Sequence, residues 1–389
     1  MQTYEYERRP LLITARSHSN IKETYAGRND MVALEVHHLV PVKRPSKTVL
    51  VFMHPIGGTQ YLPMISGMAK SGVHVISANS RYPRNESALI MEKVALDLGA
   101  VVAYARAKLG YENVVLAGWS GGGSLSLFYQ SQAENPTITH TPAGDPVDLV
   151  GAGLKPADGI MLLAAHRSRN KTLTEWLDPS ITDESRPLER DPSLNLYGVE
   201  VPEQAPFSAA FIERYRAAQI ARNRRITAWA QNLLEDARRK GRNNWEHCFV
   251  VHGTMAEPAW LDATIEPSDR KPGVCFMGDP RMVNDAPAGL GRYSSLRSWL
   301  SQFSYDLSQA DGVLCAARLS VPALLIENSA DDGCLPHHTT MMYDALASKD
   351  KEKYVVKGAN HYYFDQPELL REAMGKANEW LVRKGFLQA

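Results

Sequence analysis

The stretch that decides the fold is Asn113-Val-Val-Leu-Ala-Gly-Trp-Ser-Gly-Gly-Gly123. It begins with an apolar run of strand length, and helical spacing follows from Gly121 to Ala133. The turn between them is so tight that its neighbours must be small, which accounts for glycines two residues either side of Ser120. The pattern predicts a strand, a sharp turn that exposes the Ser120 hydroxyl, and a helix whose first amides point at it.

This glycine-rich turn has two alternative interpretations, a phosphate-binding loop and a plain packing turn. The dinucleotide pattern G-x-G-x-x-G does not fit, and no Gly-Lys-Ser/Thr follows. A strand before the turn and a helix after it are the context expected of an exposed nucleophile. We therefore interpret Ser120 as a nucleophilic serine.

Outward from this turn, apolar runs alternate with helical patterns, which is typical of an α/β fold with a mostly parallel sheet. We expect two edge or hairpin strands over residues 4–14 and 31–39. Six further strands are expected over 48–53, 73–78, 113–117, 159–165, 323–327 and 353–356, and four helices over 87–109, 121–133, 338–347 and 367–383.

The alternation stops after the strand at 159–165. The next stretch has long helical patterns at 207–240 and 294–307 and an irregular part at 257–291. The prediction is a core of residues 1–166 and 320–389, with a mainly helical cap inserted at 167–319. We see no internal repeat.

A serine nucleophile needs a base, and His361 follows the last predicted strand in the loop before the last helix. The adjacent pairs His37–His38 and His337–His338 should have diverging side chains, so surface roles are expected for them. The orienting acid should follow the strand at 323–327. Counting from the strand favours Asp331, whereas counting back from Pro336 favours Asp332. We choose Asp331, and the order Ser120, Asp331, His361 then suits a catalytic triad.

The loop His54-Pro-Ile-Gly-Gly58 follows the strand at 48–53. Adjacent glycines let the backbone approach a substrate closely, although a plain Gly-Gly turn is the alternative. The amides of Ile56 and Trp119 are the expected oxyanion donors. His54 is expected to fix this loop by hydrogen bonding.

These four motifs, in this order, resemble those of the α/β-hydrolase superfamily over about residues 30–166 and 320–389. The resemblance implies an eight-stranded, mostly parallel sheet, a cap inserted after the sixth strand, and no cofactor; no metal is expected either. Two departures stand out: Asn328 occupies a position where glycine is usual, and the aspartate is doubled.

The composition limits the classes of molecule that this protein is expected to bind. Lysine plus arginine and aspartate plus glutamate number 43 each, so nothing favours nucleic acid or an anionic membrane as a partner. The charged amino-terminus is unlike a secretory signal, no apolar run is long enough to span a bilayer, and four unpaired-looking cysteines suggest reduced thiols. We expect a cytoplasmic protein with a small-molecule substrate, and a second copy of the chain, forming a homodimer, is a further candidate partner.

The leading hypothesis is a serine hydrolase that cleaves an ester or lactone of a small hydrophobic or aromatic substrate through an acyl-enzyme on Ser120. Cleavage of a carbon–carbon, thioester or amide bond by the same triad is the alternative, and a non-catalytic receptor a third reading. Tryptophans of the cap are candidate pocket residues, although each is more often a core residue: Trp176, Trp229, Trp245 and Trp260. An arginine cluster is better explained by paired surface charges than by a substrate clamp: Arg214, Arg216, Arg222, Arg224 and Arg225.

Overall fold

A computed structural model describes residues 3–17, 21–24 and 28–388. Its centre is an eight-stranded sheet with the order β1-β2-β4-β3-β5-β6-β9-β10. The strands of this sheet are β1 (Tyr6–Arg16), β2 (Met31–Pro41), β3 (Thr48–His54), β4 (His74–Asn79), β5 (Asn113–Trp119), β6 (Gly159–Leu163), β9 (Ala323–Asn328) and β10 (Lys351–Val356).

The sheet is mostly parallel, as predicted. β1 pairs antiparallel with β2, and β2 antiparallel with β4, whereas all other neighbours run parallel. The central strands are buried along nearly their whole length, which explains why they are continuous apolar runs rather than alternating ones. β1 and β2 form the antiparallel pair expected of hairpin strands, but only β1 is an edge strand, because β2 also pairs with β4; the other edge is β10.

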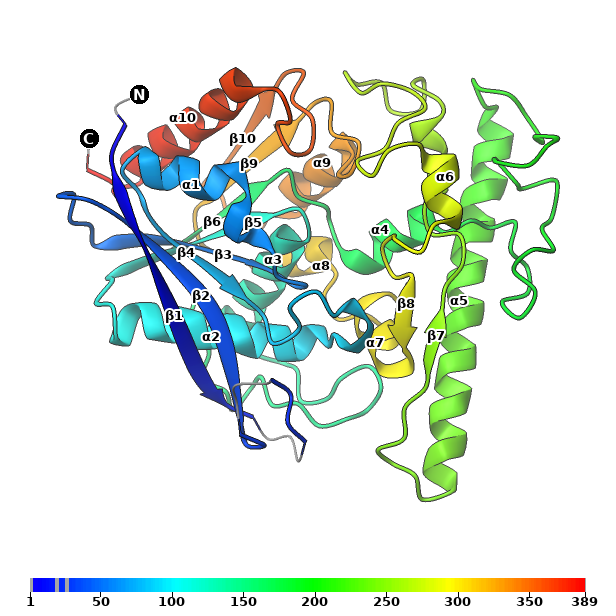
Figure 1. Ribbon diagram of the computed structural model, residues 1–389, viewed down its shortest axis with the longest axis horizontal. Coiled ribbons are helices and arrows are strands. Elements are labelled where there is room, and N and C mark those ends of the chain that lie inside the picture. Colours follow the sequence, from blue (N-terminus) through cyan, green and yellow to red (C-terminus); the bar gives the residue numbers. More distant parts are fainter. Residues whose placement is uncertain (1–2, 18–20, 25–27, 389) are drawn as a thin grey trace.

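Helices cover both faces of the sheet (Figure 1). One apolar cluster joins the sheet to α1 (Pro63–Lys70) and α10 (Pro367–Arg383). The other joins the opposite face to α2 (Met91–Ala107), α3 (Gly121–Glu134) and α9 (Pro336–Ala345). Because parallel strands end at the same edge, this arrangement brings the loops after β3, β5, β9 and β10 together.

The segment between β6 and β9 forms the right-hand part of Figure 1, where the long helix α5 stands beside the core. It has apolar clusters of its own, centred on residues such as Trp299, Trp260 and Tyr215. Its elements are α4 (Arg169–Trp176), α5 (Ala209–Arg239), β7 (Cys248–Val250), α6 (Pro280–Asp285), β8 (Tyr293–Ser295), α7 (Leu296–Gln302) and α8 (Gly312–Ala316).

We call this segment between β6 and β9 the cap. Helix α8 packs against α3 and α9, so this last part of the insertion lies with the core layers. The domain limits 166/167 and 319/320 therefore stay a prediction. Short 3-10 helices complete the structure at Thr59–Tyr61, Glu86–Ala88 and Pro258–Trp260. Within the described residues, no helix has both the length and the apolar character required to cross a bilayer.

Candidate active site

Ser120 lies at the turn between β5 and α3 with a φ of 51° and a ψ of −121°. A serine rarely adopts a positive φ, and such a conformation costs about 1–3 kcal/mol. The turn is held by the amide of Ser120, which donates to the carbonyls of Leu163 at 3.2 Å and Ala164 at 3.1 Å. The last residue of β6 and the residue after it thus hold the sharp turn that the sequence predicted.

Close packing explains the glycines around Ser120. A Cβ on Gly118 would lie 2.3 Å from the carbonyl oxygen of Gly122. A Cβ on Gly122 would lie 2.6 Å from the carbonyl oxygen of Met53 in β3. Because both obstacles are backbone atoms in packed elements, they cannot move aside, and any larger residue would displace the turn.

His361 and Asp331 form a buried pair. Nδ1 of His361 lies 2.9 Å and 3.0 Å from the two carboxylate oxygens of Asp331. The carboxylate also accepts the amides of Gly333 at 2.8 Å and Cys334 at 2.6 Å. Since the carboxylate accepts from Nδ1, that nitrogen carries the proton, which leaves Nε2 to act as a base.

Charge and burial oppose each other at this pair. Burial alone would lower the pKa of His361, but the adjacent Asp331 carboxylate outweighs it and raises the pKa well above its usual value. Asp331 has no exposed surface, and only 3 % of His361 is exposed. The Asp331 carboxylate is therefore placed to stabilise the imidazolium form of His361.

Asp332, the alternative acid, does not reach His361. Its backbone carbonyl accepts the indole N–H of Trp260 at 2.8 Å. Burial, followed by the charge of Asp331, raises the pKa of its side chain to about 6. Of the two carboxylates left open by the sequence, the structure brings Asp331 to the imidazole.

Asn328, where the sequence departs from the usual glycine, connects the acid loop to the histidine loop. Its amide nitrogen donates to the carbonyl of Asn360 at 2.9 Å, and its side-chain oxygen accepts from the hydroxyl of Tyr363 at 2.7 Å. The amide of Ala330 also donates to the carbonyl of Ala359 at 2.9 Å. These bonds fix the separation of the two loops that hold Asp331 and His361.

Cys334 is a neighbour that the sequence analysis did not single out. Its Sγ lies 3.7 Å from Oγ of Ser120, and it clusters with the side chains of Asp331 and His361. In the part of the chain that the structure describes, Ser120 makes no side-chain hydrogen bond to His361. Burial raises the pKa of the Cys334 thiol, so it is neutral. Rotation of the Ser120 side chain is required to form the relay; such bonds are often long before substrate binds.

The loop after β3 contains one expected oxyanion donor. The amide of Ile56 donates to Nδ1 of His54 at 3.3 Å, as expected if His54 fixes this loop. Burial lowers the pKa of His54 to about 3, so its ring is neutral. Because Nδ1 accepts, Nε2 of His54 carries the proton. A Cβ on Gly121 would lie 2.7 Å from this Nε2.

Trp119, the other expected donor, belongs to the end of β5, and its indole packs against His361 with ring centroids 6.1 Å apart. The residue after the serine, Gly121, is the first of α3, so its amide has no acceptor in the preceding turn of the helix. Nε2 of a second neutral and buried imidazole, His166, would lie 3.1 Å from a Cβ on Gly121. The geometry favours Gly121 over Trp119 as a donor.

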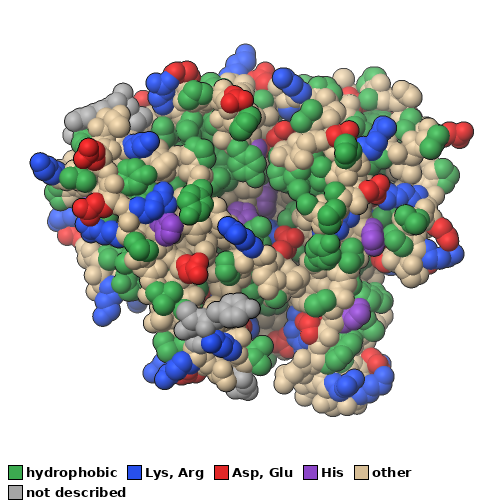
Figure 2. Space-filling model, in the orientation of Figure 1, with side chains coloured by type: hydrophobic (Ala, Val, Ile, Leu, Met, Phe, Trp, Pro, Cys, Tyr) green, Lys and Arg blue, Asp and Glu red, His purple; other side chains and the backbone are tan. Residues whose placement is uncertain are grey.

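Two of the four cap tryptophans lie near the pair. Trp176 packs against Trp260 and Phe276 with ring centroids 5.2 Å and 5.5 Å apart, and Phe276 lies 5.9 Å from His361. Trp229 and Trp245 instead pack against His247, in another part of the cap. Figure 2 shows histidine side chains in a hollow near the middle of its face.

The arginine cluster is explained mainly by ion pairs, as expected. Four of its members bind carboxylates, and Arg214 donates to the carbonyl of Ser193. Arg222 is 1 % exposed, so its part of the helix face is not solvated as the sequence suggested. The pairs are Arg216–Glu257, Arg222–Glu184, Arg224–Asp306 and Arg225–Glu184.

The expectation of surface roles for the adjacent histidine pairs is wrong in part. His38 is buried and hydrogen bonds to the hydroxyl of Tyr111 at 2.7 Å. His337 and His338 do not diverge, because both rings turn towards Glu175 of the cap. Burial opposes a charge on His337, but Glu175 and Glu266 raise its pKa to about 9.

Comparisons with known proteins agree with this architecture. No protein-family model and no curated protein matches the chain. Among solved structures, a complex of DcsB with its substrate analogue is 10% identical, with 96% of this chain and 99% of that chain covered and a TM-score of 0.52. The siderophore hydrolase EstB from Aspergillus fumigatus is 12% identical over 94% and 97%, with a TM-score of 0.49. A monoacylglycerol lipase from Paleococcus ferrophilus is 17% identical over 86% and 93%, with a TM-score of 0.43.

At such low identities these likenesses concern the fold alone. The strand order, the single antiparallel end of the sheet and the strained serine after β5 are those of the α/β-hydrolase fold. The chain has this fold, with its cap inserted between β6 and β9.

Proposed function

We propose that this protein is a serine hydrolase that cleaves a carboxylic ester or lactone. The observation that carries the proposal is the strained turn at Ser120 on the same sheet edge as the Asp331–His361 pair. A packing turn has no need of a buried acid–base pair beside it, nor of a positive φ at a non-glycine residue.

In the proposed reaction, Nε2 of His361 takes the proton of the Ser120 hydroxyl while Oγ attacks the substrate carbonyl. The Asp331 carboxylate stabilises the imidazolium that forms. The imidazolium then protonates the departing alcohol, and an acyl-enzyme remains on Ser120. A water molecule deprotonated by His361 releases the acid and restores the serine.

The negative oxygen of the tetrahedral intermediate needs donors. We assign the amides of Ile56 and Gly121 to this role, in place of the pair Ile56 and Trp119. The bond from Ile56 to His54 is long at 3.3 Å, so its exchange for an oxyanion costs little. Loss of one such donor typically lowers kcat by about 100- to 1,000-fold.

The side chains around His361 favour a small hydrophobic or aromatic substrate. Trp119 contacts the imidazole from the core, and Phe276 contacts it from the cap. Trp176 and Trp260 extend this aromatic surface behind Phe276. Aromatic faces of this kind bind apolar acyl or alcohol groups without a charged partner.

The test is turnover of p-nitrophenyl butyrate by the wild type, by Ser120→Ala and by Ser66→Ala, a control at a serine in α1. We expect Ser120→Ala to abolish turnover and Ser66→Ala to retain it. A fluorophosphonate probe should label the wild type and not Ser120→Ala. Labelling without ester turnover would redirect the proposal to a thioester, amide or carbon–carbon bond. Neither labelling nor turnover in the wild type would refute it.

A further inference from the structure

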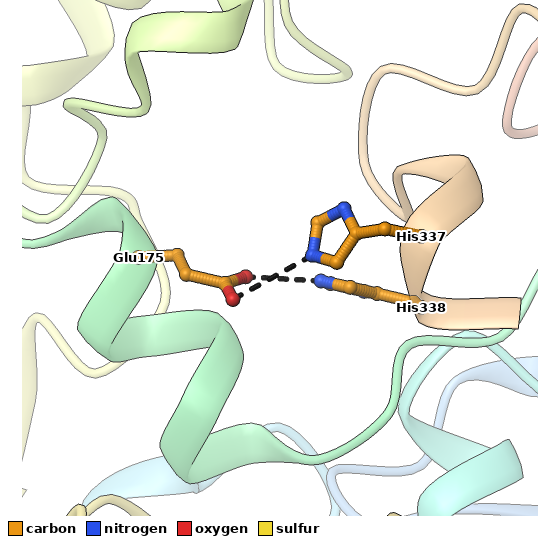
Figure 3. A group of neighbouring side chains, drawn as sticks. All are labelled: Glu175, His337 and His338. Carbon is orange, nitrogen blue, oxygen red and sulfur yellow. Dashed lines mark hydrogen bonds and ion pairs between the residues drawn. The ribbon is translucent and has the colours of Figure 1, made fainter. Parts of the chain in front are cut away.

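Outside the proposed triad, three metal-ligating side chains from distant parts of the chain meet at the boundary of cap and core. Glu175 comes from the last turn of α4, and His337 and His338 are the second and third residues of α9. Figure 3 shows both imidazoles pointing towards the Glu175 carboxylate from the opposite side. The rings of the histidines stand edge to face, 4.2 Å apart, so adjacent residues can aim at one point.

The distances suit ligands of one small ion. Nε2 of His337 lies 3.5 Å and Nε2 of His338 lies 3.0 Å from the Glu175 carboxylate oxygens, and all three ligand atoms are within 4.8 Å of one another. Tetrahedral ligands at zinc bond lengths are about 3.3 Å apart. To reach this spacing, the two distances between histidine nitrogens and Glu175 oxygens would change by only a few tenths of an ångström.

Glu266 supplies the outer support that metal-binding histidines usually have. Its carboxylate lies 2.7 Å from Nδ1 of His337 and also accepts the backbone amide of that residue. Because Glu175 and Glu266 raise the pKa of His337 to about 9, metal binding must release one proton from its ring; the Glu266 carboxylate keeps the other proton on Nδ1 and directs Nε2 towards the common point. Arg167 pairs with Glu175, so once both imidazoles are neutral the charges of Arg167, Glu175 and Glu266 sum to one net negative charge, which favours a cation.

We propose that Glu175, His337 and His338 bind one divalent transition-metal ion of the Zn²⁺ type, with a fourth position for water. Two imidazole nitrogens and one carboxylate oxygen are a common zinc set, whereas Ca²⁺ and Mg²⁺ prefer all-oxygen sites. This site uses three residues distinct from Ser120, Asp331 and His361, and takes no part in the proposed acyl transfer. It departs from the sequence-based expectation that the protein has no metal.

The position of the ligands indicates what the ion would do. α9 begins directly after the loop that holds Asp331, whereas Glu175 and Glu266 belong to the segment between β6 and β9. An ion at this point would therefore cross-link the cap to the element that follows the acid loop. Its effect would be to stabilise the contact between the cap and α9.

The experiment is titration of the chelator-treated, dialysed protein with Zn²⁺ by calorimetry and with Co²⁺ by visible absorption. We expect one ion per chain, a rise in Tm with Zn²⁺, and a four-coordinate cobalt spectrum without a thiolate charge-transfer band. His338→Gln should remove binding. Glu266→Gln should weaken it by roughly 10- to 100-fold, as loss of an outer hydrogen bond to a ligand does.

Two controls separate this site from others. His252→Gln changes a histidine elsewhere in the cap, and Cys334→Ala removes the thiol of the second cluster, formed with Asp331 and His361. Both variants should bind zinc as the wild type does. A wild type that binds no stoichiometric Zn²⁺ or Co²⁺ would overturn the proposal, whether or not any variant folds. So would a thiolate band that Cys334→Ala removes, because it would place the ion beside the triad.

Discussion

The Asp331→Asn substitution gives the sharpest test of the triad. The Asn side-chain oxygen can still accept the amides of Gly333 and Cys334, now at 2.8 Å and 2.6 Å from Oδ1 of Asp331. The other half of the side chain becomes an NH₂ group that faces Nδ1 of His361. Because NH₂ donates, Nδ1 must accept, and the ring proton moves to Nε2. The nitrogen that should take the Ser120 proton is then blocked.

The expected loss follows from this change of tautomer. In a serine protease, the equivalent aspartate-to-asparagine change lowers kcat by about 10⁴-fold. At 1.36 kcal/mol per factor of ten, this corresponds to about 5 kcal/mol of transition-state stabilisation. We expect a similar loss of kcat/KM here, with the substitution changing the pair's hydrogen bonding and leaving the buried packing nearly unchanged.

The pH profile provides a second readout. The reaction needs a neutral imidazole, so wild-type kcat/KM should fall as the pH decreases through the raised pKa of His361. In Asp331→Asn, burial persists without the carboxylate, which lowers the pKa. The remaining activity should therefore extend to lower pH than that of the wild type.

The assay is kcat/KM for p-nitrophenyl butyrate between about pH 5 and pH 9, with Asp332→Asn as the matched control. The control removes the charge of the neighbouring carboxylate, whereas the hydrogen bonds to Nδ1 of His361 come from Asp331. We expect the control to stay within about tenfold of the wild type. If Asp332→Asn lost about 10⁴-fold and Asp331→Asn did not, the assignment of the acid would be wrong.

Three further predictions concern the same edge of the sheet. Cys334→Ala should retain at least about a tenth of the activity, because the thiol neighbours Ser120 and His361 but has no role in the proposed proton transfer; a loss equal to that of Ser120→Ala would make Cys334 the nucleophile instead. Asp332→Asn should raise the free energy of unfolding above about pH 6 and not below pH 4, because a raised carboxyl pKa destabilises the fold once the group ionises; urea titration at pH 4 and pH 8 measures this. Gly122→Ala should destabilise the protein by about 1–3 kcal/mol, since its Cβ would meet a backbone oxygen, whereas Gly67→Ala in α1 would meet only the flexible Met374 side chain and should cost less in the same titration.

The sheet was predictable because its signals are local. Buried parallel strands are continuous apolar runs, and the predicted run at 113–117 became β5 with the strand extended to Trp119. The closing helix coincides with the predicted 367–383. Short elements were missed, among them α1 and α4 of eight residues each, because so few residues give little periodicity.

The proposed site was partly predictable for the same reason. Ser120, Asp331 and His361 each follow a buried strand, and the sheet brings these ends together. The choice of Trp119 as a donor stays a prediction, and we propose Gly121 in its place because the helix begins one residue after the serine. Cys334 and the pair His337–His338 were undervalued, since only tertiary contacts with Ser120 and Glu175 distinguish them from ordinary residues.

The irregular part of the cap, residues 257–291, shows why local patterns fail here. Trp260 donates to the carbonyl of Asp332, and the Asp269 carboxylate accepts the amide of Gly358 at 3.2 Å. Glu266 binds the start of α9, and Phe276 packs against His361. Several polar groups of this segment thus bind the acid and histidine loops, and these tertiary contacts leave no periodic signal in the sequence. The cap therefore does more than cover the serine: it fixes the loops that carry Asp331 and His361, so its sequence is constrained by contacts far away in the chain.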